Sequence, residues 1–323
     1  MEITQIKTIM QSLKSNWIRI VPTAIMLLVI ILIGLRVPVF LTQRNLINIL
    51  QQSASIGIMA IGMSFVFFVG GMDLSVASNM GLSGVVGALV MKNGGNPVIA
   101  GILMLLVSTF IGSINGLAVA KLNMIPFVVT LSMMYVADGL SVWLTEATSV
   151  TGISESFISI LTMKIWIIPV PVIIMLFFGF ITTMVMKRSF LGRWMYAVGT
   201  NIKAARVSCI PIEKVKFSAY LLSGLFAGLA AIITTARLGS ASAAIGQSIL
   251  VLDVASSAVV GGVSFYGGAG SPFGAVIGAL LITLISNSMN MLEVSYYVTL
   301  IIKGFVIIIF IGLESWIRAR NQS

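Results

Sequence analysis

The sequence predicts an all-α integral membrane protein with about ten membrane-spanning helices. Of its 323 residues, 58% are hydrophobic and only 9% are charged, whereas about a quarter of the residues in soluble domains are charged. The mean hydropathy is +1.10. Apolar runs of roughly 20 residues, the length that a helix needs to cross the hydrocarbon of a bilayer, recur between short polar links. Lipid is therefore the expected solvent of this chain.

The apolar runs define the expected spans. The first follows a polar start without a small-residue cleavage site, so we expect a retained anchor rather than a signal peptide. Pro22 is tolerated near its beginning, because the first helical turn has N–H groups without internal partners. The second span ends at Gly70 and Gly71, and the third and eighth are short enough for one of them to be broken or re-entrant. The expected spans are residues 17–35, 53–69, 74–91, 98–120, 125–144, 165–186, 217–235, 249–263, 273–292 and 296–313.

Residues 187–216 form the only long polar and basic run of the chain, with Glu213 as its single acid. Cytoplasmic loops of membrane proteins collect Lys and Arg, so we place this run and both termini in the cytoplasm. The net charge of +10 then reflects membrane topology and not nucleic-acid binding. We expect one transmembrane domain, 1–323, with six spans in about 17–186, a cytoplasmic loop at 187–216 and four spans in about 217–313. Few basic residues then lie outside: Arg36, Arg44, Lys92, Lys164 and Arg237.

Several kinds of chemistry are excluded by composition. The chain has no His and a single cysteine, Cys209, which excludes a His-based triad, a His or multi-Cys metal site and an internal disulfide. The glycine-rich stretch GGVSFYGGAGS (261–271) lacks the Lys of a phosphate-binding loop. We therefore expect neither ATP hydrolysis nor a bound metal or cofactor in this chain.

The 31 glycines indicate close helix packing. Many lie within spans at spacings of three to five residues, among them Gly112, Gly116, Gly224 and Gly228, and small residues let helices approach closely in lipid. Residues 123–131 and 290–300 share a short and weak sequence similarity. It is either coincidence or the trace of two inverted five-helix repeats.

Polar side chains inside spans are costly and are candidates for function. Asp73 either caps the third helix or marks a break that lines a path, and the two can hold together. Asp253 is expected to cap or pack the start of the eighth span, and Lys303 to snorkel or find a partner inside the bundle. Buried amides either join helices or contact a solute. The candidates for a translocation path are Asp73, Ser75, Asn115, Asp138, Asn287 and Asn290.

The middle of the basic run predicts a short helix at about 201–208, with Asn201 as its cap. One interpretation is a plain connector. The other is a helix that docks on a separate energy-supplying subunit, because this chain has no phosphate-binding loop of its own.

Three blocks of the chain carry a family resemblance. GGMDLSVAS (70–78), GRWMYAVGTNIKAARVSCI (192–210) and LDVASSAVVGGVSFYGGAGSPFGAVIGALL (252–281) resemble, in this order, blocks of the inner-membrane permeases of monosaccharide ABC importers, and NGLAVAKLNMIPFVVTL (115–131) fits as well. The resemblance extends from about residue 44 to 313. Ala77, Thr200 and Cys209 stand where the family usually has glycine, and Lys203 stands where an acid is common, so the matching ATPase is expected to be divergent.

The resemblance implies a multi-pass permease of the bacterial inner membrane, without an ATPase site of its own. Two permease copies, as a homodimer in the simplest case, would form the pore. A separate ATP-binding-cassette subunit would bind ATP and Mg²⁺, and an extracytoplasmic binding protein would deliver a monosaccharide or similar small polyol. The residues implied to couple the permease to the ATPase are Gly192, Gly199, Asn201, Ala204, Ala205, Arg206 and Ser208, with Gly199, Ala204 and Ala205 in contact with it.

Other functions remain open at this level. The chain can be an ABC permease for another solute, such as a branched-chain amino acid or a signalling furanose. It can also be an ion-coupled secondary carrier, although no chain of acids with a His or Lys relay is visible. A passive membrane anchor fits poorly with Asp73, Asp138 and the dense small residues.

Overall fold

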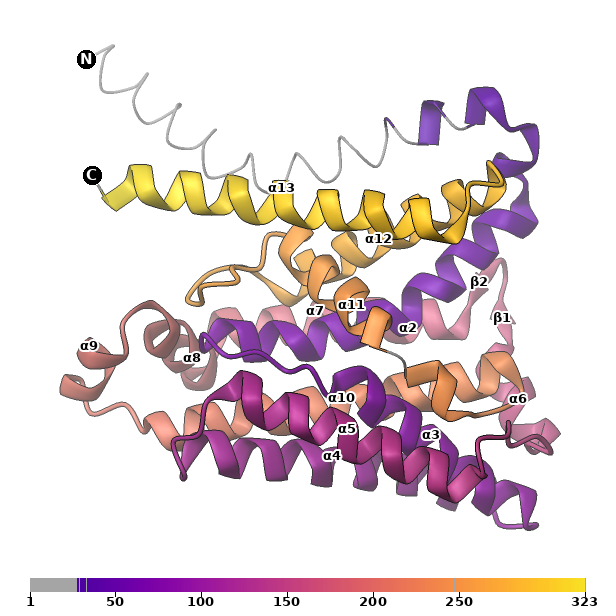
Figure 1. Ribbon diagram of the computed structural model, residues 1–323, viewed down its shortest axis with the longest axis horizontal. Helices are drawn as coiled ribbons and strands as arrows, with labels where there is room; N and C mark the ends of the chain where they lie inside the picture. The colour runs from indigo at the N-terminus through magenta and orange to yellow at the C-terminus, as the bar shows by residue number, and fades with distance from the viewer. Residues whose placement is uncertain (1–27, 29, 33, 247, 323) are drawn as a thin grey trace.

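The computed structural model describes residues 28, 30–32, 34–246 and 248–322. Long helices lie side by side along the longest axis of the molecule (Figure 1). In the described part, the strands are limited to an antiparallel pair, β1 (Lys164–Ile165) and β2 (Ile168–Pro169). The expectation of an all-α protein is confirmed. The first expected span, 17–35, lies largely outside the described residues, and so do the expected cytoplasmic N-terminus and Pro22.

Seven helical stretches of the described part are long and apolar enough to cross a membrane, and two shorter apolar helices, Val76–Lys92 and Tyr296–Gly312, accompany them. The main helices are α2 (Gln43–Phe68), α3 (Val76–Lys92), α4 (Pro97–Ala120), α5 (Pro126–Thr145), α7 (Val170–Arg188), α10 (Ile212–Leu238), α11 (Ser248–Val260), α12 (Pro272–Met291) and α13 (Tyr296–Gln322). The short helices are η1 (Pro38–Leu41), α6 (Glu155–Thr162), α8 (Phe190–Thr200), α9 (Ile202–Val207) and η2 (Ala243–Gly246).

Some expected boundaries are wrong. Helix α2 begins well before residue 53, because its first turns are polar and lie at the end of the molecule. Helix α7 begins after residue 165, because β1 and β2 occupy 164–169. The run 187–216 is mostly helical, with α8 unforeseen and α9 close to the expected 201–208. Asn201 caps α9 as expected, since its Oδ1 accepts from the N–H groups of Lys203 and Ala204, each at 3.0 Å.

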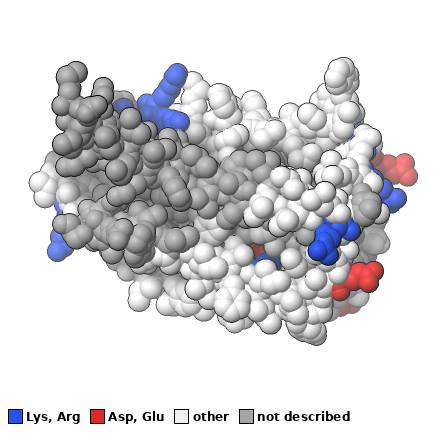
Figure 2. Space-filling model, turned by 90° about the horizontal axis from the view of Figure 1, so that it is seen from above, with Lys and Arg blue, Asp and Glu red and all other residues white. Residues whose placement is uncertain are grey.

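Charged side chains are concentrated at the two ends of the long axis. Where the surface is described, the face between these ends is almost entirely uncharged (Figure 2). One end carries α8 and α9, and the other carries the β1–β2 hairpin (Figure 1). An uncharged band between two charged ends is the surface that a bilayer requires.

Glycines allow α10 to pack closely against α4. A Cβ atom at Gly224 of α10 would stand 2.5 Å from the Ser108 carbonyl oxygen of α4, and one at Gly112 of α4 would stand 2.5 Å from the Tyr220 carbonyl oxygen of α10. Real Cβ atoms cannot come so close. The glycines therefore set the separation of these helices, as the sequence predicts.

Helix α2 ends in a Schellman motif. Gly70 has φ 71°, and the N–H groups of Gly70 and Gly71 donate to the carbonyl oxygens of Phe67 and Val66, at 2.8 and 2.9 Å. The chain then runs without helical structure until α3 begins at Val76 (Figure 1). With 17 residues, α3 is about 25 Å long, which is shorter than the hydrocarbon layer of roughly 30 Å. The non-helical segment 69–75 makes up part of the difference.

The close packing of α10 on α4 can be tested with one methyl group. We expect Gly224→Ala to lower the free energy of unfolding by about 1–3 kcal/mol, because the added methyl group must push α4 away. Gly139→Ala is the matched control, since a Cβ there meets no atom within 4 Å. Denaturation of the purified protein in detergent measures both. Equal stability of the two variants would show that Gly224 does not set the helix separation.

Candidate functional site

Asp73 is the centre of a buried polar cluster where α2, α3 and α10 meet. Its side chain is 2% exposed. One carboxylate oxygen accepts from the backbone N–H and the hydroxyl of Ser75, at 3.0 and 2.7 Å. The other accepts from the hydroxyl of Ser223 on α10, at 2.7 Å. Asp73 therefore joins the non-helical segment to the second half of the chain.

The cluster extends to α4 and α5. Asn115 of α4 donates from Nδ2 to the Ser75 hydroxyl at 2.8 Å. The carbonyl oxygen of Met72 accepts from Tyr220 of α10 at 3.3 Å and from Thr130 of α5 at 3.4 Å. Three helices, α4, α5 and α10, thus hold the segment that contains Asp73 in place.

Of the two readings of Asp73, the structure supports the break in the helix. The N-cap position of α3 belongs to Ser75, so Asp73 does not occupy the cap position that we expected. The reason is that α3 starts later than residue 74. The Asp73 side chain does accept a free N–H group directly before the helix, that of Ser75, and it also reaches across to α10.

The remaining path candidates lie elsewhere. Asp138 is half-buried on α5, beside Ser78 of α3. Asn287 of α12 forms a reciprocal amide pair with Asn45 of α2, with both N–O distances 3.0 Å, and so joins two helices. Asn290 is exposed. The structure therefore joins Asp73, Ser75 and Asn115 by hydrogen bonds, whereas Asp138 and Asn287 have other partners.

Asp253 and Lys303 form an ion pair between α11 and α13. The Lys303 Nζ lies 2.9 Å from a carboxylate oxygen of Asp253, and both side chains are 14% exposed. The expectation that Lys303 finds a partner inside the bundle is confirmed. Asp253 lies inside α11 and pairs with Lys303, so it does not cap this helix.

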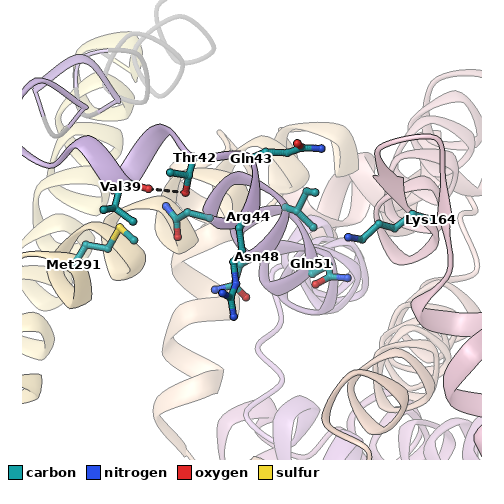
Figure 3. Close-up of a pocket in the computed structure, with 10 residues that line it drawn as sticks. Val39, Thr42, Gln43, Arg44, Asn48, Gln51, Lys164 and Met291 are labelled. Carbon is teal, nitrogen blue, oxygen red and sulfur yellow. Dashed lines mark hydrogen bonds between the residues drawn. The ribbon is translucent and has the colours of Figure 1, made fainter.

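A polar cavity of about 870 Å³ opens at the end of the molecule opposite to α8 and α9. Lys164 extends toward it from the hairpin, and Arg44, Asn48 and Gln51 reach it from α2 (Figure 3). Amide and cationic groups dominate its polar lining. The lining residues are Val39, Thr42, Gln43, Arg44, Asn45, Ile47, Asn48, Gln51, Lys164 and Met291.

Burial divides the expected coupling residues into two groups. Gly192 and Ala205 are buried, and Gly199 lies with its α-carbon against the backbone of α2. Ala205 is turned toward the protein, and so is the position that a Cβ at Gly199 would take, because α8 and α9 lie on the ends of the other helices and need small residues there. Gly199 itself is half-buried, and its contact and that of Ala205 with a docked partner stay predictions. The accessible residues are Asn201, Ile202, Lys203, Ala204, Arg206, Val207 and Ser208.

Three glycine-containing segments meet beside α8, and we call this contact the glycine junction. It comprises Phe68 and Gly70 at the end of α2, Tyr196 and Gly199 of α8, and Gly267, Gly268 and Gly270 of the loop before α12. Gly268 N–H donates to the Phe68 carbonyl oxygen at 3.1 Å. The Tyr196 hydroxyl donates to the Gly270 carbonyl oxygen at 2.8 Å. Burial raises the pKa of Tyr196 to about 12, so its hydroxyl stays protonated and able to donate.

No cluster of three or more metal-binding side chains occurs among the described residues. The polar groups around Asp73 are hydroxyls and amides that hydrogen-bond to its carboxylate or to one another. Such an arrangement can bind and orient polar groups.

Sequence reasoning missed Ser223, the glycine junction and the polar cavity. Ser223 is one small polar residue among the small residues of α10, and nothing local marks it as the partner of Asp73. The amides of the cavity lie in what we expected to be a loop. Only the glycine-rich stretch 261–271 gave a signal; we tested it as a phosphate-binding loop and used it in the family resemblance, without expecting it to contact α2 and α8.

Comparison with known proteins gives a consistent result. A family model described as "Branched-chain amino acid transport system / permease component" matches residues 45–311. The chain is 37% identical to the ribose import permease protein of Bacillus subtilis, over 89% of both chains. It is 37% identical to the D-allose transport system permease protein of Escherichia coli K12, over 85% of this chain and 84% of the relative. It is 29% identical to the xylose transport system permease protein of the same organism, over 87% of both. No solved structure matches the chain significantly.

The bond between Ser223 and Asp73 can be tested by deleting one hydroxyl. We expect Ser223→Ala to cost about 1.5–3 kcal/mol of unfolding free energy, because it removes a buried hydrogen bond to a charged acceptor. Ser218→Ala is the control on the same helix, since its hydroxyl donates only to Val215 O of α10, at 2.9 Å. Denaturation in detergent measures both, and a loss as large in Ser218→Ala would contradict the assignment.

Proposed function

The chain belongs to the family of branched-chain amino acid transport system permease components, and on this premise we propose that it imports a monosaccharide or similar small polyol as the membrane subunit of an ATP-binding-cassette importer. The observation that carries the choice of solute is the similarity, over most of the chain, to permeases named for ribose, allose and xylose. The protein is a multi-pass protein of the inner membrane.

The interior of the protein supports an uncharged, hydroxyl-rich solute. The Asp73 cluster offers the hydroxyls of Ser75 and Ser223 and the amide of Asn115, and the polar cavity offers further amides and the N–H groups of Arg44 and Lys164. Such groups exchange hydrogen bonds readily with sugar hydroxyls. Asp73, Ser75 and Asn115 are our best assignment for the path, and Asp138, Asn287 and Asn290 are weaker ones. The cavity is of a size usual for small-molecule sites, roughly 300–1,000 Å³, and would receive the solute first.

The topology of the chain belongs to the same proposal. We assign ten spans in a single permease domain, both termini in the cytoplasm, and two inverted repeats of five helices. Two features support the repeat. Helices α3 and α11 are the short ones, one in each half, and each follows a segment that leaves the α-helical path. These parts also meet, since Ser78 of α3 donates to Gly246 O before α11 at 3.2 Å.

The energy would come from a partner ATPase that docks on α9. Val207 is 85% exposed and Ile202 is 39% exposed, and Lys203 and Arg206 flank them. Protein–protein interfaces have an apolar centre and a polar rim, and this arrangement fits that pattern. The partner would bind ATP and Mg²⁺, an extracytoplasmic binding protein would deliver the solute, and two permease copies would enclose the path.

Transport by the reconstituted importer tests the proposal. We expect uptake of ribose, allose or xylose into liposomes that contain the permease with its partner ATPase, when the binding protein is outside and ATP is inside. ADP in place of ATP should abolish uptake, and an ionophore should leave it unchanged. Uptake that persists without ATP and follows an ion gradient would identify an ion-coupled carrier instead.

Docking and orientation can be tested together, because the single cysteine lies next to α9. Cys209 is exposed. We expect an impermeant maleimide to label it in inside-out vesicles and not in right-side-out vesicles, and the bound ATPase to protect it.

The matched variants place a charge on each end of the molecule. Val207→Asp should weaken ATPase binding at least about tenfold, a change of ~1.4 kcal/mol, and so remove the protection. Trp166→Asp, at a residue that is 96% exposed on the hairpin, should leave protection intact. Labelling from the wrong side would reject the orientation, and protection retained in Val207→Asp would reject docking on α9.

A further inference from the structure

The glycine junction brings three segments that are distant in sequence into backbone contact. The Phe68 carbonyl oxygen of α2 accepts from Gly268 N–H of the loop before α12. A Cβ atom at Gly199 of α8 would stand 1.9 Å from that same oxygen and 2.6 Å from the Gly268 nitrogen. The loop before α12 reaches back toward α8 and the end of α2 (Figure 1). All three segments therefore meet at the Phe68 carbonyl oxygen.

These contacts cannot be relieved by a side-chain rotation. A Cβ at Gly268 would stand 2.9 Å from the Thr200 backbone nitrogen, and one at Gly267 would stand 3.0 Å from the Gly70 nitrogen. Both loop glycines have positive φ, 75° and 92°, which other residues rarely adopt. Because the backbones touch directly, a displacement of α8 must move the other two segments or break the contact.

Tyr196 is the side chain that locks the junction. Its ring packs on that of Phe68, with a distance of 4.9 Å between centroids, and its hydroxyl donates to Gly270 O. It therefore connects α8 to the end of α2 and to the loop before α12 at once. The hydrogen bond can be removed while the ring contact is kept.

The junction leads directly to the Asp73 cluster. The Schellman motif fixes Gly70 and Gly71 to the last turn of α2, and the next residues are Met72 and Asp73, which are bonded to α10. On the other side, Gly270 precedes Ser271, whose hydroxyl caps α12 by accepting from Gly274 N–H at 3.1 Å. A movement of α8 can thus reach both halves of the bundle by short routes.

We propose that the glycine junction, locked by Tyr196, is the joint that transmits movement of α8 and α9 to the Asp73 segment. This inference rests on the proposed function, in which α9 receives the ATPase. It assigns Tyr196, Gly199 and Gly268 as positioning residues, which act on the path through segment 69–75. The coupling strength then depends on contacts far from both the ATPase surface and the solute.

The variant Tyr196→Phe in the assembled importer tests whether the glycine junction transmits movement or only stabilises the structure. We expect ATPase binding and thermal stability close to those of the wild type, and a roughly fivefold drop in solute transported per ATP hydrolysed, the weight of one hydrogen bond in an equilibrium. Hydrogen exchange of segment 69–75 gives a second measurement. Trapping the ATPase with ATP and vanadate should change its exchange in the wild type and not in Tyr196→Phe.

Tyr135→Phe is the matched control, because it removes a phenol that is 66% exposed on α5 and should transport normally. Gly199→Ala forces the junction apart and should uncouple transport more strongly, provided that the variant still binds the ATPase. Unchanged transport per ATP in Tyr196→Phe, with the exchange change retained, would overturn the joint. Absence of ATP-driven transport in the wild type would instead overturn the proposed function, and the joint with it.

Discussion

The segment between α2 and α3 interrupts the helical path, so its polar groups must find partners other than helical ones. In lipid an unpaired backbone group costs several kcal/mol, and this requirement shapes the surroundings of the segment. The Schellman motif satisfies the end of α2, α5 and α10 donate to Met72, and α10 donates to Asp73. The helices around the break are therefore held by the polar groups that the break exposes.

The same pairing gives the interior its chemical character. Among the described residues, Asp253 and Lys303 form the one ion pair, and the polar groups near Asp73 are hydroxyls and amides. Groups of this kind exchange hydrogen bonds with neutral polar molecules. The interior is therefore polar where the helical path is interrupted and largely apolar elsewhere.

Glycine has two separate uses in this protein. Gly112 and Gly224 let α4 and α10 approach, which sets the spacing of the bundle. Gly199, Gly267 and Gly268 instead let three chain segments touch at the end that carries α8 and α9. The first use sets the spacing of the helices, and the second joins α8 directly to the end of α2 and to the loop before α12, with little room for rearrangement.

The sequence by itself determined the elements whose causes are local. Hydropathy and turn residues placed α4 and α12 within a residue or two of the expected spans, Gly70 and Gly71 predicted the end of α2, and the cap at Asn201 followed from its position before α9. Only the tertiary structure decided that Asp73 bonds to Ser223, a residue 150 positions away, and that Gly199 faces inward. Hydropathy and helical periodicity depend only on residues that are close to one another in the sequence. Which polar groups meet across helices depends instead on helix separation and rotation, and these are set by packing among all the helices at once.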